Sequence, residues 1–217
     1  MRSLSLLILL LCSSTLVWAK KNKNKIVLIE TTMGTMKVEL FKETPLHSEN
    51  FLKLVDEGFY DSLLFHRVIP NFMIQGGDPD SKRALPGQML GNGDVGYKIP
   101  AEFMDTFYHK KGALAAARDN NPEKASSGCQ FYIVQGKVFN DEDLNAMEAR
   151  KGKPFPAKVR EDYKTIGGTP HLDGGYTVFG QLLEGYDVLE NITHVACSAG
   201  DRPIEDVRIL SMKVVKK

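Results

Sequence analysis

The chain has 217 residues, a length that supports one domain with a sizeable hydrophobic core. Its 28 Lys and Arg against 27 Asp and Glu give a formal net charge of +1, which provides no electrostatic reason to expect nucleic acid or an anionic membrane surface as a partner. Three cysteines are too few for a disulfide scaffold.

The first 19 residues have the pattern of a secretory signal peptide. Arg2 is a basic start, Leu6 to Leu11 form an unbroken apolar run, and residues 17–19 are small or apolar where a signal peptidase reads. A membrane-spanning helix needs about 20 apolar residues, and the polar residues from Ser13 interrupt the run too early. We therefore expect cleavage after Ala19, a periplasmic or secreted protein, and no membrane association after cleavage.

The lysine-rich residues 20–25 predict a solvated, disordered leader, and residues 26–217 a single domain. Alternation in KIVLIETTMGTMKVELF, residues 25–41, predicts two strands joined by a turn at residues 33–35. Helical spacing follows, with Thr44 as the N-cap, Pro45 as the first helical residue and Gly58 as the stop.

Three later segments predict further strands, each short, rich in β-branched or aromatic residues and bounded by turn formers: residues 131–136, 176–185 and 207–215. Because short strands outnumber helices, the pattern favours a closed antiparallel barrel over a doubly wound sheet. Residues 139–168 depart from it. Helical spacing on both sides of Gly152, Pro154 and Pro156 predicts a helical insertion at about residues 140–168.

The stretch FHRVIPNFMIQGGD, residues 65–78, places a cation, Arg67, inside an apolar run that ends in two glycines and an aspartate. Arginine is costly to bury unpaired, so Arg67 is either a partnered structural ion or the single polar group of an apolar cleft. Composition alone leaves both readings open. We expect Asp78 to cap a turn, and His66 to be a hydrogen-bonded structural residue rather than a base.

The remaining His and Cys residues do not predict a metal or redox centre. The five histidines show no pair at metal-ligand spacing, and no CxxC spacing is present. Cys129 and Cys197 remain after signal cleavage in a compartment where a disulfide is chemically possible. A bridge and two separate thiols are both open on the sequence alone.

The stretch FHRVIPNFMIQGGD, with SSGCQFYIV at residues 126–134 and HLDGGYTVFG at 171–180, resembles the cyclophilin family of peptidyl-prolyl cis-trans isomerases. The resemblance runs from about Ile26 to Val215 and keeps the family's motifs in order. It looks like an exported, bacterial-like member with a helical insertion. The resemblance implies a mainly β fold, a closed eight-stranded antiparallel barrel capped by helices. It also implies peptidyl-prolyl isomerase activity (EC 5.2.1.8) with no cofactor and no metal.

The resemblance also implies roles for individual residues. Arg67 would be the catalytic cation, and Gln75 and Gln130 would fix the polar side of the cleft. The other substrate-binding residues form the apolar pocket for the proline ring or lie along the substrate backbone, and they are Phe72, Met73, Ala117, Arg118, Tyr132, Leu172 and Tyr176.

Three of these positions depart from the family's pattern, and so does His171, which the resemblance also implies is a substrate-binding residue. Arg118 stands where many members carry Asn, Tyr132 replaces a Phe, and Tyr176 replaces a His. His171, on the rim, stands where cyclosporin-sensitive members carry Trp. We expect substrate turnover to survive these changes, because a backbone contact or a ring is kept at the first three.

The chemistry of X–Pro bonds explains why an arginine is useful here. Conjugation of the amide gives a rotation barrier of ~20 kcal/mol. A guanidinium over the prolyl nitrogen can hydrogen-bond the lone pair as it localises in the twisted transition state. We expect a monomeric isomerase acting on proline-containing peptides and on unfolded or folding exported proteins. The alternative is a chaperone module that binds such segments without turnover, and retention of Arg67 favours the enzyme.

Overall fold

The computed structural model describes residues 24–215, so the expected signal peptide (residues 1–19) lies outside the described residues. Of the expected leader, residues 20–25, residues 20–23 also lie outside the described residues. Lys25 already belongs to strand β1 (Lys25–Thr31) and pairs with Leu40 of strand β2 (Gly34–Leu40). The prediction of disorder is therefore wrong for Lys25, because a neighbouring strand takes up its backbone groups.

Eight strands form one antiparallel sheet in the order β10-β1-β2-β9-β6-β8-β4-β3. Short strands β5 (Lys98–Ile99) and β7 (Ser126–Ser127) form a separate antiparallel pair. The other strands of the main sheet are β3 (Phe65–Ile69), β4 (Met73–Gly76), β6 (Ala113–Ala116), β8 (Phe131–Val134), β9 (Val178–Glu184) and β10 (Ile209–Val215).

The first hairpin turns one residue earlier than its sequence predicts. Thr31 pairs with Gly34, which leaves Thr32 and Met33 as the turn. Gly34 has a φ of +127°, and a Cβ there would lie 2.7 Å from Cγ2 of Val188, so both backbone and packing require glycine.

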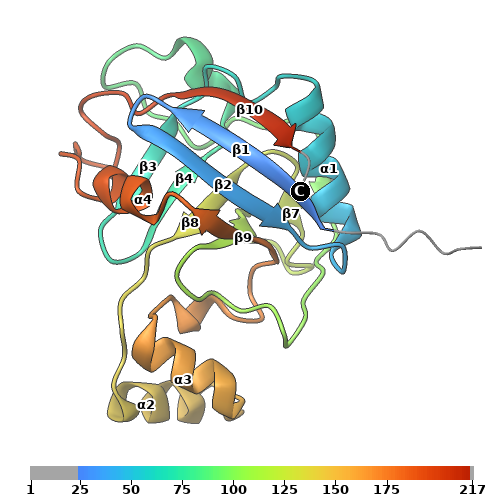
Figure 1. The fold of residues 1–217 in the computed structure, drawn as a ribbon, viewed down its shortest axis with the longest axis vertical. Coiled ribbons are helices and arrows are strands. Elements are labelled where there is room, and N and C mark those ends of the chain that lie inside the picture. The colour runs from blue at the N-terminus through green and yellow to red at the C-terminus, as the bar shows by residue number, and fades with distance from the viewer. Residues whose placement is uncertain (1–23, 216–217) are drawn as a thin grey trace, which may run out of the picture.

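Helices α1 (Pro45–Asp56) and α4 (Tyr186–Thr193) lie on opposite sides of the sheet body in Figure 1. Each buries one apolar stripe in the main core, which includes Phe51 and Leu54 of α1 and Leu189 and Ile192 of α4. Pro45 opens α1 as predicted, but the side chain of Thr44 makes no capping hydrogen bond.

Strands β3 and β10 are the two ends of the strand order, and isolated backbone contacts connect them. The Ser62 N–H donates to the Ile209 carbonyl at 2.8 Å, and the Ile209 N–H donates to the Leu63 carbonyl at 2.8 Å. Phe65 N–H donates to the Val207 carbonyl at 2.9 Å. The fold is thus mainly β, a curled eight-stranded antiparallel sheet with helices, in which β3 and β10 are not paired as a ladder.

Two helices occupy the region of the predicted insertion, α2 (Asp141–Lys151) and α3 (Ala157–Thr165), and both hang below the sheet body in Figure 1. The Asn140 side chain accepts a hydrogen bond from the Asp143 N–H at 2.8 Å, and Gly152 ends α2 in the left-handed region. The helices close over a small core of their own, Phe139, Leu144, Val159 and Tyr163.

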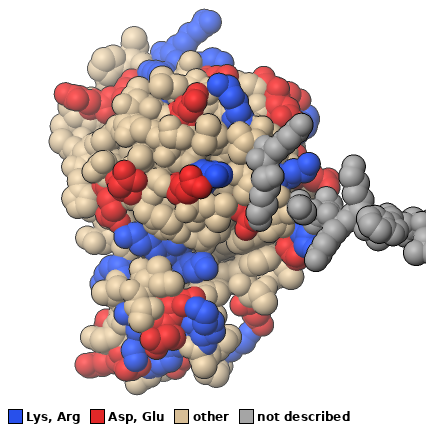
Figure 2. Space-filling view, in the orientation of Figure 1, with Lys and Arg blue, Asp and Glu red and all other residues tan. Residues whose placement is uncertain are grey.

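The outer face of the insertion carries interspersed charges of both signs, as Figure 2 shows. Asp141 pairs with Arg160 and with Lys164, each at 2.8 Å, and Arg160 also reaches Glu148 at 3.1 Å. Exposed pairs of this kind contribute about 0–1 kcal/mol each. Across residues 24–215, no helix has the length and apolar character needed to cross a membrane.

Candidate active site

A cavity of about 600 Å3 opens beside β3, β4 and β8 and gathers most of the predicted site residues. Nine of them line it: Arg67, Phe72, Met73, Gln75, Ala117, Arg118, Tyr132, Leu172 and Tyr176. Gln130 and His171 do not line it, but each contacts a residue that does. Gln130 bonds Gln75, and the His171 ring lies 5.6 Å from the Phe72 ring.

Arg67 lies on β3 directly opposite Gln75 on β4, so the strand register brings the two side chains to the same face. The Arg67 Nη1 donates to Gln75 Oε1 at 3.4 Å, and Nε lies 3.4 Å from Asp201 Oδ2. The side chain is 41% exposed. Both contacts are long, so the guanidinium keeps donors available for a ligand in the cavity.

A chain of amide hydrogen bonds fixes the orientation of Gln75. Gln75 Nε2 donates to Gln130 Oε1 at 3.0 Å, and Gln130 Nε2 donates to the carbonyls of Gly91 and Gly93, each at 2.9 Å. Gln75 must therefore turn its own carbonyl oxygen towards Arg67. Gln130 acts behind the cavity wall, as a residue that positions Gln75.

The apolar part of the cavity is built on a second hydrophobic cluster that includes Met73 and Tyr132, both nearly fully buried. Phe72, Leu172 and Tyr176 pack against this cluster and stay partly exposed at the opening. Apolar walls with a few polar groups at one edge are the usual make-up of a small-ligand pocket.

A buried chain of hydrogen bonds, which we call the Tyr132 relay, connects this pocket to the insertion. Tyr132 Oη lies 2.9 Å from His109 Nε2, and His109 Nδ1 lies 2.8 Å from Asp173 Oδ1. The Tyr163 hydroxyl of α3 donates to Asp173 Oδ2 at 2.7 Å. Burial raises the pKa of both tyrosines, which therefore stay neutral. His109 donates from Nδ1 to the Asp173 carboxylate and meets the Tyr132 hydroxyl at Nε2.

The sequence analysis missed His109, Asp173 and Tyr163. One sign of a polar partner behind the pocket was present in the sequence, because Tyr132 stands where the family carries Phe. A buried tyrosine hydroxyl needs a hydrogen-bond partner, so a polar partner behind the pocket could have been expected, although not which one.

Ala117 and Arg118 differ in the backbone groups they can offer to a substrate. The Ala117 N–H donates to the Gln130 carbonyl at 2.9 Å, and its carbonyl accepts from the Ser127 N–H at 2.8 Å. Within residues 24–215, the Arg118 N–H and carbonyl have no such partner. The Arg118 side chain donates from Nε to the Gly175 carbonyl at 2.7 Å and lies 4.6 Å from the Tyr176 ring centre.

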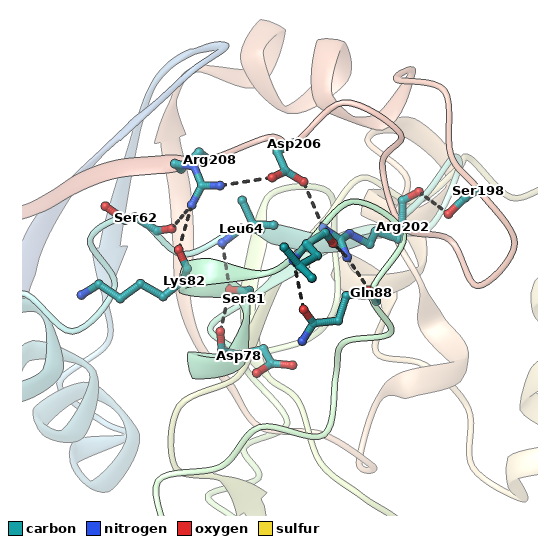
Figure 3. Close-up of polar contacts among 11 residues, drawn as sticks. Ser62, Leu64, Asp78, Ser81, Lys82, Gln88, Ser198, Arg202, Asp206 and Arg208 are labelled. Carbon is teal, nitrogen blue, oxygen red and sulfur yellow. Dashed lines mark hydrogen bonds and ion pairs between the residues drawn. The ribbon is translucent and has the colours of Figure 1, made fainter.

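One wall of the cavity is a long loop that includes residues 87–92, and the buried Arg202 holds it in place. Arg202 Nη1 donates to the carbonyls of Leu85, at 3.1 Å, and Gln88, while Nη2 pairs with Asp206 at 3.2 Å. Figure 3 shows Arg202 between Gln88 and Asp206. Three carbonyl or carboxylate partners compensate a cation that is only 7% exposed.

The same close-up shows the turn after the two glycines. Asp78 Oδ1 accepts from the Asp80 N–H at 2.8 Å and its carbonyl accepts from the Ser81 hydroxyl at 2.6 Å. Ser81 Oγ in turn accepts from the Leu64 N–H at 3.0 Å. The prediction that Asp78 caps a turn is confirmed.

The prediction for His66 is wrong. Neither ring nitrogen has a hydrogen-bond partner among residues 24–215, although the residue is only 3% exposed and lines the cavity. Burial lowers the pKa of His66 to about 4, with nearby Arg67 and Arg202 acting in the same direction. The ring is therefore neutral at physiological pH.

His66 should make the protein less stable in mild acid. The unfolded chain binds a proton near pH 6.5 and the folded chain only near pH 4, so stability falls as the pH drops across this window and is unaffected above it. The full loss is about 3 kcal/mol. Denaturant unfolding of His66→Gln between pH 7 and 4 should show a shallower decline than wild type. The exposed His194→Gln is the control, and an unchanged decline in His66→Gln would contradict the assignment.

The structure decides between the alternatives left open for the cysteines. Cys129 is buried and Cys197 is partly buried, and both are free thiols. Burial raises the pKa of Cys129 to about 11, which makes this thiol a poor nucleophile. Within residues 24–215, no group of three or more His, Cys, Asp or Glu is arranged to hold a metal ion.

Comparison with known proteins identifies the family of the chain. Residues 26–214 match the family model of cyclophilin type peptidyl-prolyl cis-trans isomerases. The chain belongs to this family. Its residues are 39% identical, over 189 residues, to a peptidyl-prolyl cis-trans isomerase of Staphylococcus epidermidis, with 87% of this chain and 90% of that protein covered. The activity of the cyclophilin family is the isomerisation of peptidyl-prolyl bonds, EC 5.2.1.8.

Two further comparisons extend the match. A bifunctional phosphatase/peptidyl-prolyl cis-trans isomerase of Streptococcus pyogenes is 40% identical over 191 residues, but this cyclophilin spans only 38% of that relative's length. A crystal structure of a Cryptosporidium parvum cyclophilin matches with a TM-score of 0.68 at 25% identity, covering 89% of this chain and 99% of that one. A second structure of that protein, obtained in the presence of the dipeptide Ala-Pro, matches with a TM-score of 0.64.

Proposed function

We propose that the chain isomerises X–Pro bonds in the 600 Å3 cavity, with Arg67 as the catalytic residue. The proline ring lies in the pocket of Phe72, Met73, Tyr132 and Leu172, and the guanidinium lies over the prolyl nitrogen. The observation that carries the proposal is the position of Arg67 at the edge of this apolar pocket, where its side chain makes two polar contacts with the described residues 24–215, both of 3.4 Å.

Two effects of this arrangement can lower the barrier to X–Pro rotation by the amount that catalysis requires. Reducing the half-time of rotation from about a minute to a millisecond requires a barrier lower by about 6 to 7 kcal/mol. A hydrogen bond to the localised lone pair forms only in the twisted transition state, so it lowers the barrier rather than only tightening binding. The apolar pocket also positions the substrate, because it holds the proline ring while the preceding carbonyl turns.

The substrate backbone is best placed against Arg118 rather than Ala117. Both backbone groups of Ala117 are already bonded within the protein, whereas those of Arg118 are open to a partner. Ala117 then contributes its methyl group to the cavity wall. The Asn-to-Arg departure at position 118 is compatible with this role, since the contact uses main-chain atoms.

A protease-coupled assay on a short Ala-Pro peptide tests the proposal. Acceleration of cis-to-trans conversion in proportion to protein concentration is expected. The alternative, a chaperone module that binds proline-containing segments without turnover, predicts binding of the same peptide with no acceleration.

We also propose that the protein is exported and acts as a monomer on folding clients in the periplasm or outside the cell. The support is the basic start, apolar run and small-residue site of residues 1–19. Mass spectrometry of the protein recovered from its host should find an N-terminus at Lys20. An intact Met1 on the mature protein would contradict export by this route.

We further propose that the sheet closes into a barrel in solution along β3 and β10. The support is the set of backbone hydrogen bonds from residues 62–65 to residues 207–209. Hydrogen exchange should protect the amides of Phe65 and Ile209 as well as that of Ile133 on the inner strand β8. If the Phe65 and Ile209 amides exchange within the dead time of the experiment, β3 and β10 are not joined and the barrel is open.

Cyclosporin inhibition should be weak, because His171 replaces the tryptophan of sensitive family members. His171 is an exposed rim residue against Phe72. Losing about 50 Å2 of apolar contact costs ~1.3 kcal/mol, and a misplaced hydrogen bond adds about 1 more, which predicts inhibition about 10- to 100-fold weaker. Titration of isomerase activity should show that His171→Trp restores sensitivity. A wild type already as sensitive as a tryptophan-bearing cyclophilin would refute this.

A further inference from the structure

A second cavity, of about 510 Å3, lies between the insertion and the sheet body, and we call it the insertion groove. Its sheet-side wall is the segment 103–108, which hangs towards the insertion in Figure 1. Its other wall is the turn between α2 and α3 together with Val159 of α3. The groove is therefore absent from any cyclophilin that lacks an insertion at this place.

Both walls of the groove present apolar side chains. On the sheet side, Phe103 is 41% and Met104 39% exposed. On the insertion side, Pro154 and Pro156 flank Phe155, whose ring packs edge-on against Tyr163 at 5.6 Å. Because each proline fixes its own φ, the wall around Phe155 is held in shape before any ligand arrives. Large apolar side chains left exposed around a preformed hollow mark a binding surface.

The groove and the active-site cavity share one residue, Tyr176, which lines both. A few residues earlier in the chain, Leu172 lines the active site, while Asp173 and Gly174, which follow it directly, line the groove. A peptide bound at the active site can thus reach the groove by passing Tyr176. Since an extended chain advances about 3.3–3.6 Å per residue, a few residues suffice.

The charges at the groove favour an apolar occupant over an anionic one. Lys151 Nζ donates to the carbonyls of Pro170, at 2.5 Å, and Asp173, at 3.2 Å. Lys153 pairs with Asp105 at 3.1 Å. With both amines already partnered, an added carboxylate gains little here, while an aromatic or long aliphatic side chain gains contact with Phe103 and Phe155.

We propose that the insertion groove is a second subsite for the polypeptide substrate. It takes an aromatic or large aliphatic side chain that lies a few residues from the isomerised proline in the same client. The inference deepens the proposed function and rests on it. It assigns the insertion a role in selecting unfolded segments, because large apolar side chains are much more exposed in an unfolded client than in a folded one.

The test uses peptides with one Ala-Pro bond, extended by eight residues on either side and carrying a single Phe at successive positions, with Ser in its place as the control. At the best position, the Phe peptide should show a KM about five- to ten-fold lower than its Ser partner, an effect of partial burial of one ring. Phe103→Ala should remove the advantage. Leu210→Ala, which trims an exposed side chain on β10, should keep it.

The unextended Ala-Pro peptide separates this proposal from the proposed function. Phe103→Ala should isomerise this short peptide at the wild-type rate. If the wild-type protein does not isomerise it, the proposed isomerase activity is wrong. Binding is measured independently by fluorescence anisotropy with Phe peptides in which Ala replaces Pro. Equal KM for Phe and Ser peptides at every position overturns the subsite. So does a concentration-dependent dimer that Phe103→Ala abolishes, because a second copy would then occupy the groove.

Discussion

Replacing Arg67 with alanine should lower kcat/KM for X–Pro isomerisation at least about ten-fold, a loss of roughly 1.4 kcal/mol of transition-state stabilisation. The fold should survive, because the side chain is 41% exposed and its two contacts are long. Denaturant unfolding of the variant should match wild type within about 0.5 kcal/mol. The same assay on Arg67→Lys should also show impairment, since a point ammonium lacks the planar fork of donors.

The exposed Arg83→Ala is the matched control, and it removes the same charge from the short helix after β4. It should retain wild-type activity, which excludes a general effect of net charge. If Arg67→Ala isomerises the peptide at the wild-type rate, the apolar pocket alone accelerates rotation and the mechanism proposed for Arg67 is wrong.

Replacing Asp173 with alanine should destabilise the protein by about 2 to 4 kcal/mol. The change leaves the His109 N–H, the His109 ring Nδ1 and the Tyr163 hydroxyl without their acceptor in a buried setting. Each unsatisfied buried group costs about 1–3 kcal/mol, and the low end of this range applies to the three groups here because the Asp173 side chain is partly exposed. For a chain of this size the midpoint of thermal unfolding should fall by about 5 to 15 °C.

Thermal and denaturant unfolding of purified variants measure this effect. Asp56→Ala, which removes an exposed carboxylate at the end of α1, should stay within about 0.5 kcal/mol of wild type. Tyr132→Phe removes only the far end of the Tyr132 relay and should cost about 1 kcal/mol. An Asp173→Ala protein as stable as wild type would show that the relay does not hold the insertion to the pocket.

The relay bears on whether the insertion can be removed. Because the family's motifs resume at His171, a short turn in place of residues 140–168 would leave every predicted site residue in the chain. In the structure, Tyr163 of α3 is fully buried and bonds Asp173 directly behind the pocket. Deleting the insertion would remove that bond and expose the surface beneath it.

The sequence predicts those parts of the site that lie on neighbouring short strands, such as the two strands within residues 65–78. Arg67 and Gln75 are eight residues apart, and alternation on two antiparallel strands places both side chains towards the cavity. Tyr132 joins them because β8 pairs with β4, opposite Gln75. Local periodicity and a tight turn are enough to determine such an arrangement.

The parts that escaped prediction depend on contacts between distant segments. Arg202 bonds the Gln88 carbonyl 114 residues away, and His109 meets Asp173 across 64 residues. The backbone hydrogen bonds from residues 62–65 to residues 207–209 also join segments that lie far apart in the sequence. No pattern along the chain specifies these meetings. The ring of His66 is a similar case, because only the packed structure shows that no hydrogen-bond partner from the described part of the chain reaches its nitrogens.

An isomerase turns over X–Pro bonds in this cavity, whereas a binding module only holds them. Two-dimensional NMR exchange spectroscopy on an Ala-Pro peptide, with substoichiometric wild-type protein, measures binding and isomerisation in one sample. Turnover should give cis–trans exchange cross-peaks within a mixing time of about a second, where the free peptide needs tens of seconds or more. Peptide resonances that shift on binding but show no exchange cross-peaks would contradict it and leave a binding module.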